Sequence, residues 1–145
     1  MRSRVLRLLF AGDPLAPRAV DSMYQREADA AVGLGIATDL LDFESLVNDG
    51  DAERATRRVA EPGPDDLCVY RGWRMQPAQY TALFEALQRR GVVLVNDPDA
   101  YRRCHYLPEW YASLADSTPR SVWLTDTSLD AVMHAVQPLA LRHWC

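Results

Sequence analysis

Short apolar stretches recur along the chain at intervals that leave room for helices between them. Five of these stretches have the length and composition of buried strands, residues 5–10, 36–43, 67–70, 92–95 and 121–124. The second contains Asp39 and Asp42, which are unusual in a buried strand. Five strands separated by helical segments predict a mostly parallel sheet.

Between the predicted strands, apolar residues repeat at the three- and four-residue spacing of a helix. The first helix is expected to open near Pro17 and to end at Gly33 and Gly35. Further helices are expected over residues 52–59, 77–90, 107–114 and 129–136, the last after a Thr127 or Ser128 cap. The fold class predicted is α/β, as a single three-layer domain with a mostly parallel sheet of about five strands. That domain is expected to span residues 1–136, with residues 137–145 as a C-terminal tail.

Composition narrows the class of protein. The chain has 145 residues, 48% of them hydrophobic and 25% charged, as in an ordinary globular domain. No apolar run reaches the ~18 residues that cross a bilayer, and the N-terminal run is too short for a signal peptide. The formal net charge of −4 argues against a nucleic-acid partner, because such proteins carry a basic surface. We therefore expect a cytoplasmic protein without a membrane or nucleic-acid partner.

All 16 basic residues are arginines, and this excludes several enzyme classes. Without lysine the chain offers no Schiff-base lysine, no Walker-type phosphate lysine and no lysine general base. The motifs GxGxxG, GxxxxGK[ST] and GxSxG are also absent. We expect no catalytic residue in these 145 residues.

The cysteines and histidines do not form a recognisable metal motif. Cys68, Cys104 and Cys145 are widely spaced and no CxxC occurs, so reduced thiols are the simplest interpretation. His105 and Glu109 are four residues apart, but two ligands do not make a zinc site. We predict no metal site, and structural roles for these residues.

Candidate binding residues follow the predicted strands, because ligands of open α/β sheets bind beyond the carboxyl ends of the strands. Arg71 and Arg74 could offer planar guanidinium groups to a carboxylate or phosphate, and Gly72 between them would let the backbone turn sharply. The alternative is that these arginines are solvated surface residues. The remaining candidates are Gly12 and Asp13 after the first strand, where a plain connecting turn is the alternative, and Asn96 after the fourth.

One set of segments resembles a known family. Tyr70-Arg71-Gly72-Trp73, the stretch NDPDAYRRCHYLPEWY at 96–111 and TPRSVW at 118–123 resemble the N-terminal region of ATP-grasp proteins of the R2K type, over about residues 4–136. The resemblance implies a pre-ATP-grasp α/β domain on the acceptor-substrate side of an ATP-dependent carboxylate–amine or carboxylate–thiol ligase. For a full-length member it implies ATP and magnesium as cofactors.

The ATP and magnesium residues of that family have no counterpart in this chain. We therefore expect no cofactor in the chain itself, which would be inactive alone, and a truncation point near residues 137–145. Its expected partners are a small anionic substrate and either missing ATP-grasp lobes or a subunit that carries them. Two alternatives remain open, a stand-alone module for a small anion and a module that docks onto a partner.

Overall fold

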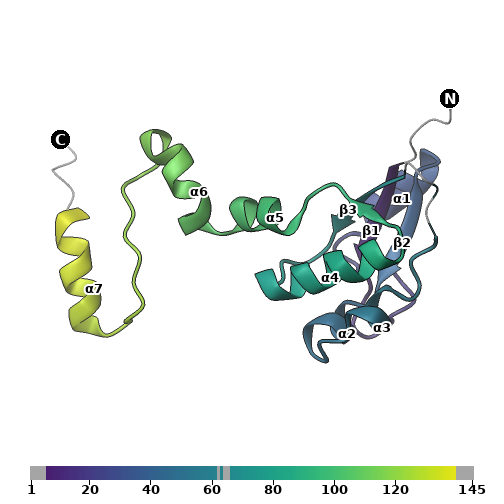
Figure 1. Ribbon diagram of the computed structural model, residues 1–145, viewed down its shortest axis with the longest axis horizontal. Coiled ribbons are helices and arrows are strands. Elements are labelled where there is room, and N and C mark those ends of the chain that lie inside the picture. The colour runs from purple at the N-terminus through teal and green to yellow at the C-terminus, as the bar shows by residue number, and fades with distance from the viewer. Residues whose placement is uncertain (1–5, 62, 64–65, 140–145) are drawn as a thin grey trace. The chain divides into compact units, whose positions relative to one another are not determined.

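The computed structural model describes residues 6–61, 63 and 66–139, and it contains one parallel sheet (Figure 1). Its strands are β1 (Leu6–Ala11), β2 (Ala37–Leu41), β3 (Leu67–Arg71) and β4 (Val93–Leu94), in the order β2-β1-β3-β4. Leu9 lies opposite Asp39 of β2 and Tyr70 of β3. The predicted α/β class with a parallel sheet is confirmed.

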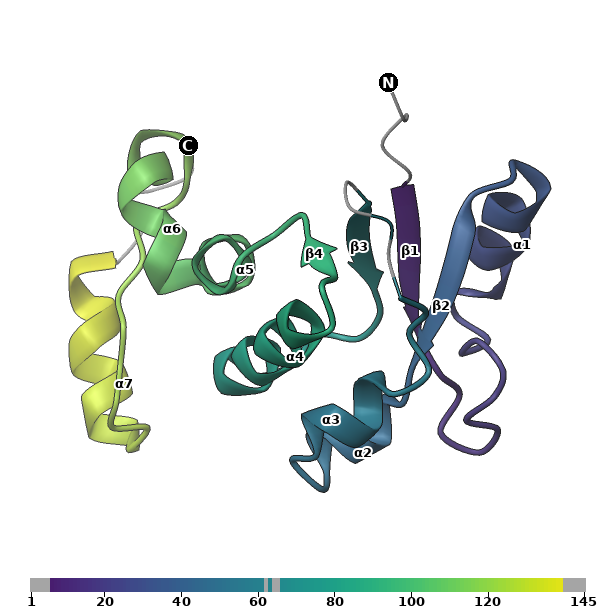
Figure 2. The ribbon, with the colours of Figure 1, turned by 45° about the vertical axis from the view of Figure 1, so that its right-hand side comes forward.

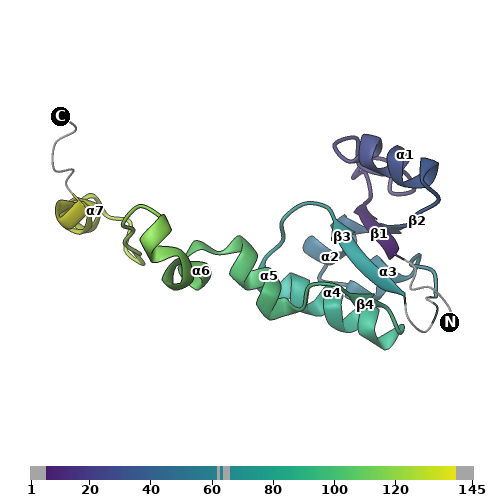
Figure 3. The same ribbon diagram turned by 90° about the horizontal axis from the view of Figure 1, so that it is seen from above.

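The chain separates into two compact units, Met1–Arg102 and Arg103–Cys145. In the first unit, α1 (Gln25–Gly33) lies on one face of the sheet and α4 (Pro77–Arg89) on the other (Figure 3). Two short helices, α2 (Phe43–Val47) and α3 (Ala52–Thr56), connect β2 to the segment before β3, and α3 packs beside α4. The three layers expected from the sequence are thus present within this unit.

The core of the first unit lies between the sheet and α4. Leu9 and Leu41 from the sheet and Leu83 and Leu87 from the helix are fully buried. Complete burial of a leucine side chain stabilises the fold by roughly 1.5–3 kcal/mol. This shared apolar layer fixes the sheet on α4 and thereby positions the carboxyl ends of the strands.

Local signals set the ends of the helices. Pro77 occupies the first turn of α4, and Gln76 and Gln79 form a reciprocal capping box there. Gly91 ends the helix with a φ of 77°, a conformation that favours glycine. Asp42 follows β2 and is buried because its carboxylate has a partner. It accepts a hydrogen bond from the Ser45 N–H and so caps α2.

The segment between β1 and α1 differs from the prediction. We expected a helix from Pro17, but α1 begins at Gln25 and residues 12–24 form turns (Figure 2). The Asp13 carboxylate accepts the N–H groups of Leu15 and Ala16, so a local turn replaces the start of a helix. An isolated antiparallel bridge between Gly12 and Val20 then closes the loop.

The second unit is helical in the part that the structure describes. Along it lie α5 (Pro98–His105), which crosses the boundary between the units, α6 (Leu107–Leu114), η1 (Ala115–Ser117), α7 (Leu129–Val136) and η2 (Gln137–Leu139). Of the two predicted caps, Thr127 and Ser128, it is the Ser128 hydroxyl that caps α7, by accepting the Ala131 N–H. None of the residues 103–139 is buried.

The prediction of a fifth strand over residues 121–124 is wrong. No strand forms there, and 47% of Trp123 is exposed. The segment is held instead by the Tyr111 side chain, whose hydroxyl accepts the Ser121 N–H and whose ring meets Trp123 edge-on at 5.5 Å. A short apolar run becomes a strand only where a neighbouring strand pairs with it, and none does among the described residues. The expected boundary at residue 136 stays a prediction, and residues 140–145 lie outside the described part.

Candidate functional site

The strand order places the carboxyl ends of β1 and β3 at a topological switch point. The chain passes from β1 to β2 on one side and returns to β3 on the other side of β1. In doubly wound sheets, ligands bind in the crevice that such a reversal opens. The predicted residues Gly12 and Asp13 follow β1, and Arg71 and Gly72 end and follow β3, so the four lie at this point.

Arg71 is held in a fixed orientation by α1. Its Nε donates to Oε2 of Glu27 at 2.7 Å and its Nη2 donates to Oε1 at 2.6 Å, a bidentate pair. The guanidinium also lies 6.0 Å from the centre of the Tyr24 ring. About 45% of the Arg71 side chain is exposed, and no described residue accepts a hydrogen bond from its Nη1. The edge of the guanidinium opposite Glu27 can therefore receive an oxyanion.

The pair shifts the titration of both partners. The hydrogen bond from Arg71 lowers the pKa of Glu27, and the same bond raises the pKa of Arg71. Partial burial raises the pKa of the neighbouring Tyr24. At neutral pH the site thus contains an ionised pair and a neutral phenol, and the guanidinium of that pair suits binding of an anion.

Trp73, in the loop after β3, contacts the loop that follows β1. Its Nε1 donates to Oδ2 of Asp21 at 3.0 Å, and its ring meets that of Tyr24 edge-on at 5.9 Å. The Tyr70 hydroxyl donates to the Trp73 carbonyl at 2.8 Å and leaves no room for a side chain at Gly72. Gly72 is thus required by close packing rather than by a ligand.

Gly12 and Asp13 are used by the fold itself. The Gly12 N–H donates to the Leu41 carbonyl at 2.9 Å, and a Cβ at this position would lie 3.1 Å from that oxygen. The Asp13 N–H donates to the Ala19 carbonyl, while its carboxylate holds the turn described above. These backbone donors are not directed at a ligand, so the turn is not a phosphate cradle of the kind found before helices.

The other two candidates, Arg74 and Asn96, follow β3 and β4 at the same edge of the sheet. Arg74 is exposed in the loop before α4. Asn96 follows β4, and its backbone carbonyl accepts the hydroxyl of Tyr80 at 2.8 Å. The side chains that hold Arg71 are those of Glu27 and Tyr24, which come from α1 and the turn before it. Sequence reasoning missed Glu27, Tyr24 and Asp21, whose only signal is that they lie just before and within the first helix.

Beneath this edge lie three tyrosines in contact, of which Tyr80 and Tyr101 are buried and Tyr70 is half-buried. The rings of Tyr80 and Tyr101 are stacked with centres 3.8 Å apart, and Tyr70 meets Tyr80 edge-on at 6.5 Å. Burial raises the pKa of both Tyr70 and Tyr80 well above the usual range. Burial also raises the pKa of the Cys68 thiol to about 12, so it is not a nucleophile at neutral pH.

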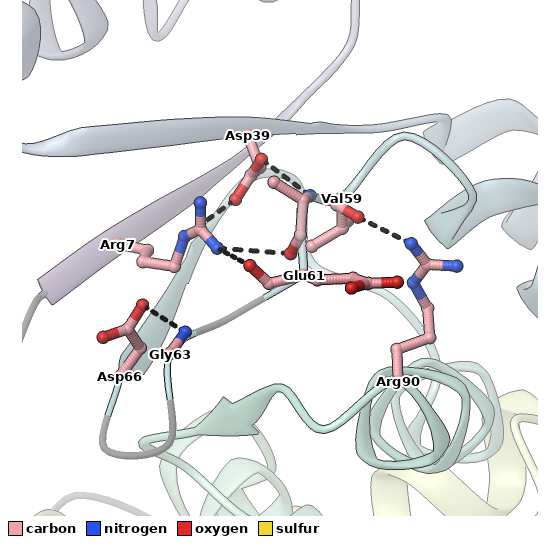
Figure 4. Close-up of polar contacts among 8 residues, drawn as sticks. Arg7, Asp39, Val59, Glu61, Gly63, Asp66 and Arg90 are labelled. Atoms are coloured by element: carbon pink, nitrogen blue, oxygen red, sulfur yellow. Dashed lines mark hydrogen bonds and ion pairs between the residues drawn. The ribbon is translucent and has the colours of Figure 1, made fainter.

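A second polar cluster lies under the opposite end of the sheet (Figure 4). Arg7 Nε lies 3.2 Å from Oδ2 of Asp39, and Arg7 Nη1 donates to the carbonyls of Ala60 and Glu61. The other carboxylate oxygen of Asp39 accepts the Ala60 N–H, and Arg90 donates to the Val59 carbonyl at 2.7 Å. These contacts fix the segment after α3 to the sheet, and we assign the cluster a structural role.

The described residues do not fit magnesium or ATP. They contain no group of three or more His, Cys, Asp or Glu side chains that could hold a metal ion. The sequence has no lysine for the phosphates, and the Gly12 N–H is already bonded to Leu41. Within the described residues there is also no helix with the length and apolar character needed to cross a membrane.

Comparison with models of protein families, with curated proteins and with solved structures finds no match to this chain.

Proposed function

We propose that Arg71 binds the carboxylate or phosphate of a small molecule at the switch point of the sheet. The observation that carries this proposal is the orientation of its guanidinium. Glu27 occupies the Nε–Nη2 edge, no described residue accepts a hydrogen bond from Nη1, and about 45% of the Arg71 side chain is exposed. A guanidinium already fixed by a carboxylate loses less conformational entropy when it binds a second anion.

The sequence resemblance supports a place for this site in a larger reaction. In ATP-grasp ligases of the resembled type, the pre-ATP-grasp domain contributes to the acceptor-substrate side. We propose that this chain is such a substrate-side domain, and that the ATP phosphates and magnesium are held by residues outside these 145. Because a ligand stabilises only a protein that binds it, magnesium with ATP should leave the melting temperature of the chain unchanged.

The anion site is tested by a binding screen on matched variants. We would measure thermal shifts of the chain with a panel of small mono- and dicarboxylates and phosphate esters. Arg71→Ala is expected to abolish any shift, and Arg71→Lys to weaken binding about tenfold or more, since a lysine cannot reproduce the planar donor edge. Arg26→Ala, which removes an exposed arginine of α1 outside the site, is the control. A ligand that binds Arg71→Ala as tightly as the unchanged protein would refute the assignment.

The same geometry supports a second candidate, a stand-alone module for a small anion. All residues of the site lie within the Met1–Arg102 unit, so binding need not require another lobe. Reading the coding DNA beyond codon 145 separates the two candidates. A continuing frame with lysines and acidic magnesium ligands would support the ligase domain, and unrelated sequence would support the stand-alone module.

A further inference from the structure

Among the described residues, a stretch of backbone at the free edge of β2 has no hydrogen-bond partner. β2 is an outer strand of the sheet, with β1 on one side. The Leu41 carbonyl accepts the N–H of Gly12, so Leu41 directs its backbone groups toward β1. Since successive residues of a strand direct these groups to opposite sides, those of Thr38 and Leu40 point to the free edge.

The two ends of this edge are closed and its middle is open. The Ile36 N–H donates to the Ala31 carbonyl, and the Asp42 N–H donates to the Ala55 carbonyl. Within residues 6–61, 63 and 66–139, no group pairs with the N–H or carbonyl of Thr38 or Leu40 at this edge. Unpaired groups of this kind form a template for an added strand.

The open stretch lies in a groove of about 490 Å³. The groove is lined by Arg18 and Val20 from the loop after β1, by Thr38, Asp39 and Leu40 of β2, and by Arg58. Arg58 Nη1 donates to the Pro17 carbonyl at 2.5 Å, which joins the loop to the segment after α3. Val20 and Leu40 provide apolar surface for alternate side chains of an extended segment.

The charge of the groove indicates which kind of extended peptide segment could bind in it. Of its three charged residues, Asp39 is already paired with Arg7 and with the Ala60 N–H. Arg18 and Arg58 therefore give the groove a positive character. A second copy of the same edge would bring these arginines against each other, and like charges in contact disfavour such a pair. An acidic segment is complementary.

We propose that the free edge of β2 binds an extended acidic peptide segment of a partner protein by strand addition. The segment pairs its backbone with Thr38 and Leu40 and places glutamate or aspartate side chains near Arg18 and Arg58. This site is separate from Arg71, because β1 lies between β2 and β3. The proposal does not depend on the function proposed for Arg71.

The probe is a fluorescein-labelled heptapeptide that alternates valine and glutamate, measured by fluorescence anisotropy with the full chain. It is expected to bind, and added salt is expected to weaken the binding because exposed charges are screened. Arg18→Glu and Arg58→Glu should each lower the affinity about fivefold, which corresponds to the upper end of the range for the loss of one exposed ion pair. Arg18 makes no hydrogen bond or ion pair in the described structure, so its variant keeps the fold even if Arg58→Glu loosens the loop.

Matched controls distinguish strand addition from charge attraction. Arg57→Glu reverses the same charge one position away, outside the groove, and should leave binding unchanged. Two N-methylated peptides, blocked on alternate amides, should differ, since only one set of amides faces β2. Equal binding of both, retained binding by Arg18→Glu, no binding of the heptapeptide, or self-association of the chain through this edge would each overturn the proposal.

Discussion

The buried pair of Arg7 and Asp39 gives a prediction of stability that can be worked from the structure. The side chains are 12% and 7% exposed, and Arg7 Nε lies 3.2 Å from Asp39 Oδ2. Asp39→Asn removes the negative charge and leaves the guanidinium with the carbonyls of Ala60 and Glu61. Removing one partner of a buried ion pair destabilises proteins by roughly 3–5 kcal/mol, because the other charge stays buried.

The expected loss lies at the lower end of that range. Neither Arg7 Nε nor Asp39 Oδ2 has a well-directed hydrogen bond, so their contact is mainly electrostatic. Asparagine also keeps an oxygen that can accept the Ala60 N–H. We expect a loss of about 3 kcal/mol in the free energy of unfolding, a large part of the roughly 5–15 kcal/mol typical of a domain. At about 4 °C per kcal/mol, the melting temperature falls by about 12 °C.

The assay is urea unfolding of the chain, followed by circular dichroism, with a matched control. Asp49→Asn removes the carboxylate of an exposed pair with Arg54, 3.7 Å apart, and should cost less than about 1 kcal/mol. A double variant, Arg7→Met with Asp39→Leu, should lose less stability than Asp39→Asn, because no charge is left buried. The reasoning is refuted if Asp39→Asn costs no more than the control, or if the double variant loses more.

Three further predictions concern the sheet and the site. Gly72→Ala should destabilise the fold by about 1–3 kcal/mol in urea unfolding, because its methyl group overlaps the hydroxyl of Tyr70; an unchanged midpoint would contradict that packing. Iodoacetamide at pH 8 should alkylate exposed Cys104 and spare buried Cys68, whose pKa is raised to about 12, as peptide mass spectrometry will show; labelling of Cys68 in the folded chain would contradict its burial. The hydrogen bond from Arg71 lowers the pKa of Glu27 in the folded protein below the usual value of 4.5. The small contribution of the Glu27–Arg71 pair to the free energy of unfolding is therefore complete above about pH 4.5, and it is lost as the pH falls through the lowered pKa. The difference in melting temperature between the unchanged chain and Glu27→Gln should therefore be larger at pH 7 than at pH 3, and equal differences would count against the pair.

Much of the fold follows from local pattern in the sequence. Apolar spacing predicts β3 and α4, and Pro77 and Gly91 predict where α4 begins and ends. The structure contains both elements at these positions. The segment after Pro17 was misjudged, because side-chain hydrogen bonds of Asp13 and Asp21 to nearby N–H groups stabilise turns there. Spacing of apolar residues carries no information about such local competition.

The sequence predicted only those residues of the candidate site that follow a strand. Arg71 was selected because it closes an apolar run, and the switch point depends on a strand order that one sequence does not reveal. Its partner Glu27 is 44 residues away in the chain, and the two meet only because α1 packs beside β1 and β2. Arg74 and Asn96 were selected by the same criterion, their position after a strand, whereas the side chains that hold Arg71 come from α1 and the turn before it.

The most direct test of the account is an NMR titration of the Arg71 side chain. The Nε–Hε signal, assigned by its loss in Arg71→Lys, reports on the guanidinium that Glu27 orients. We predict that at least one small carboxylate or phosphate ester shifts this signal in a saturable way, while the Nε–Hε signal of Arg26 stays in place. If the Arg71 signal does not move with any member of the panel, or if it moves only in proportion to that of Arg26, then Arg71 is a structural partner of Glu27 and the proposed site is contradicted.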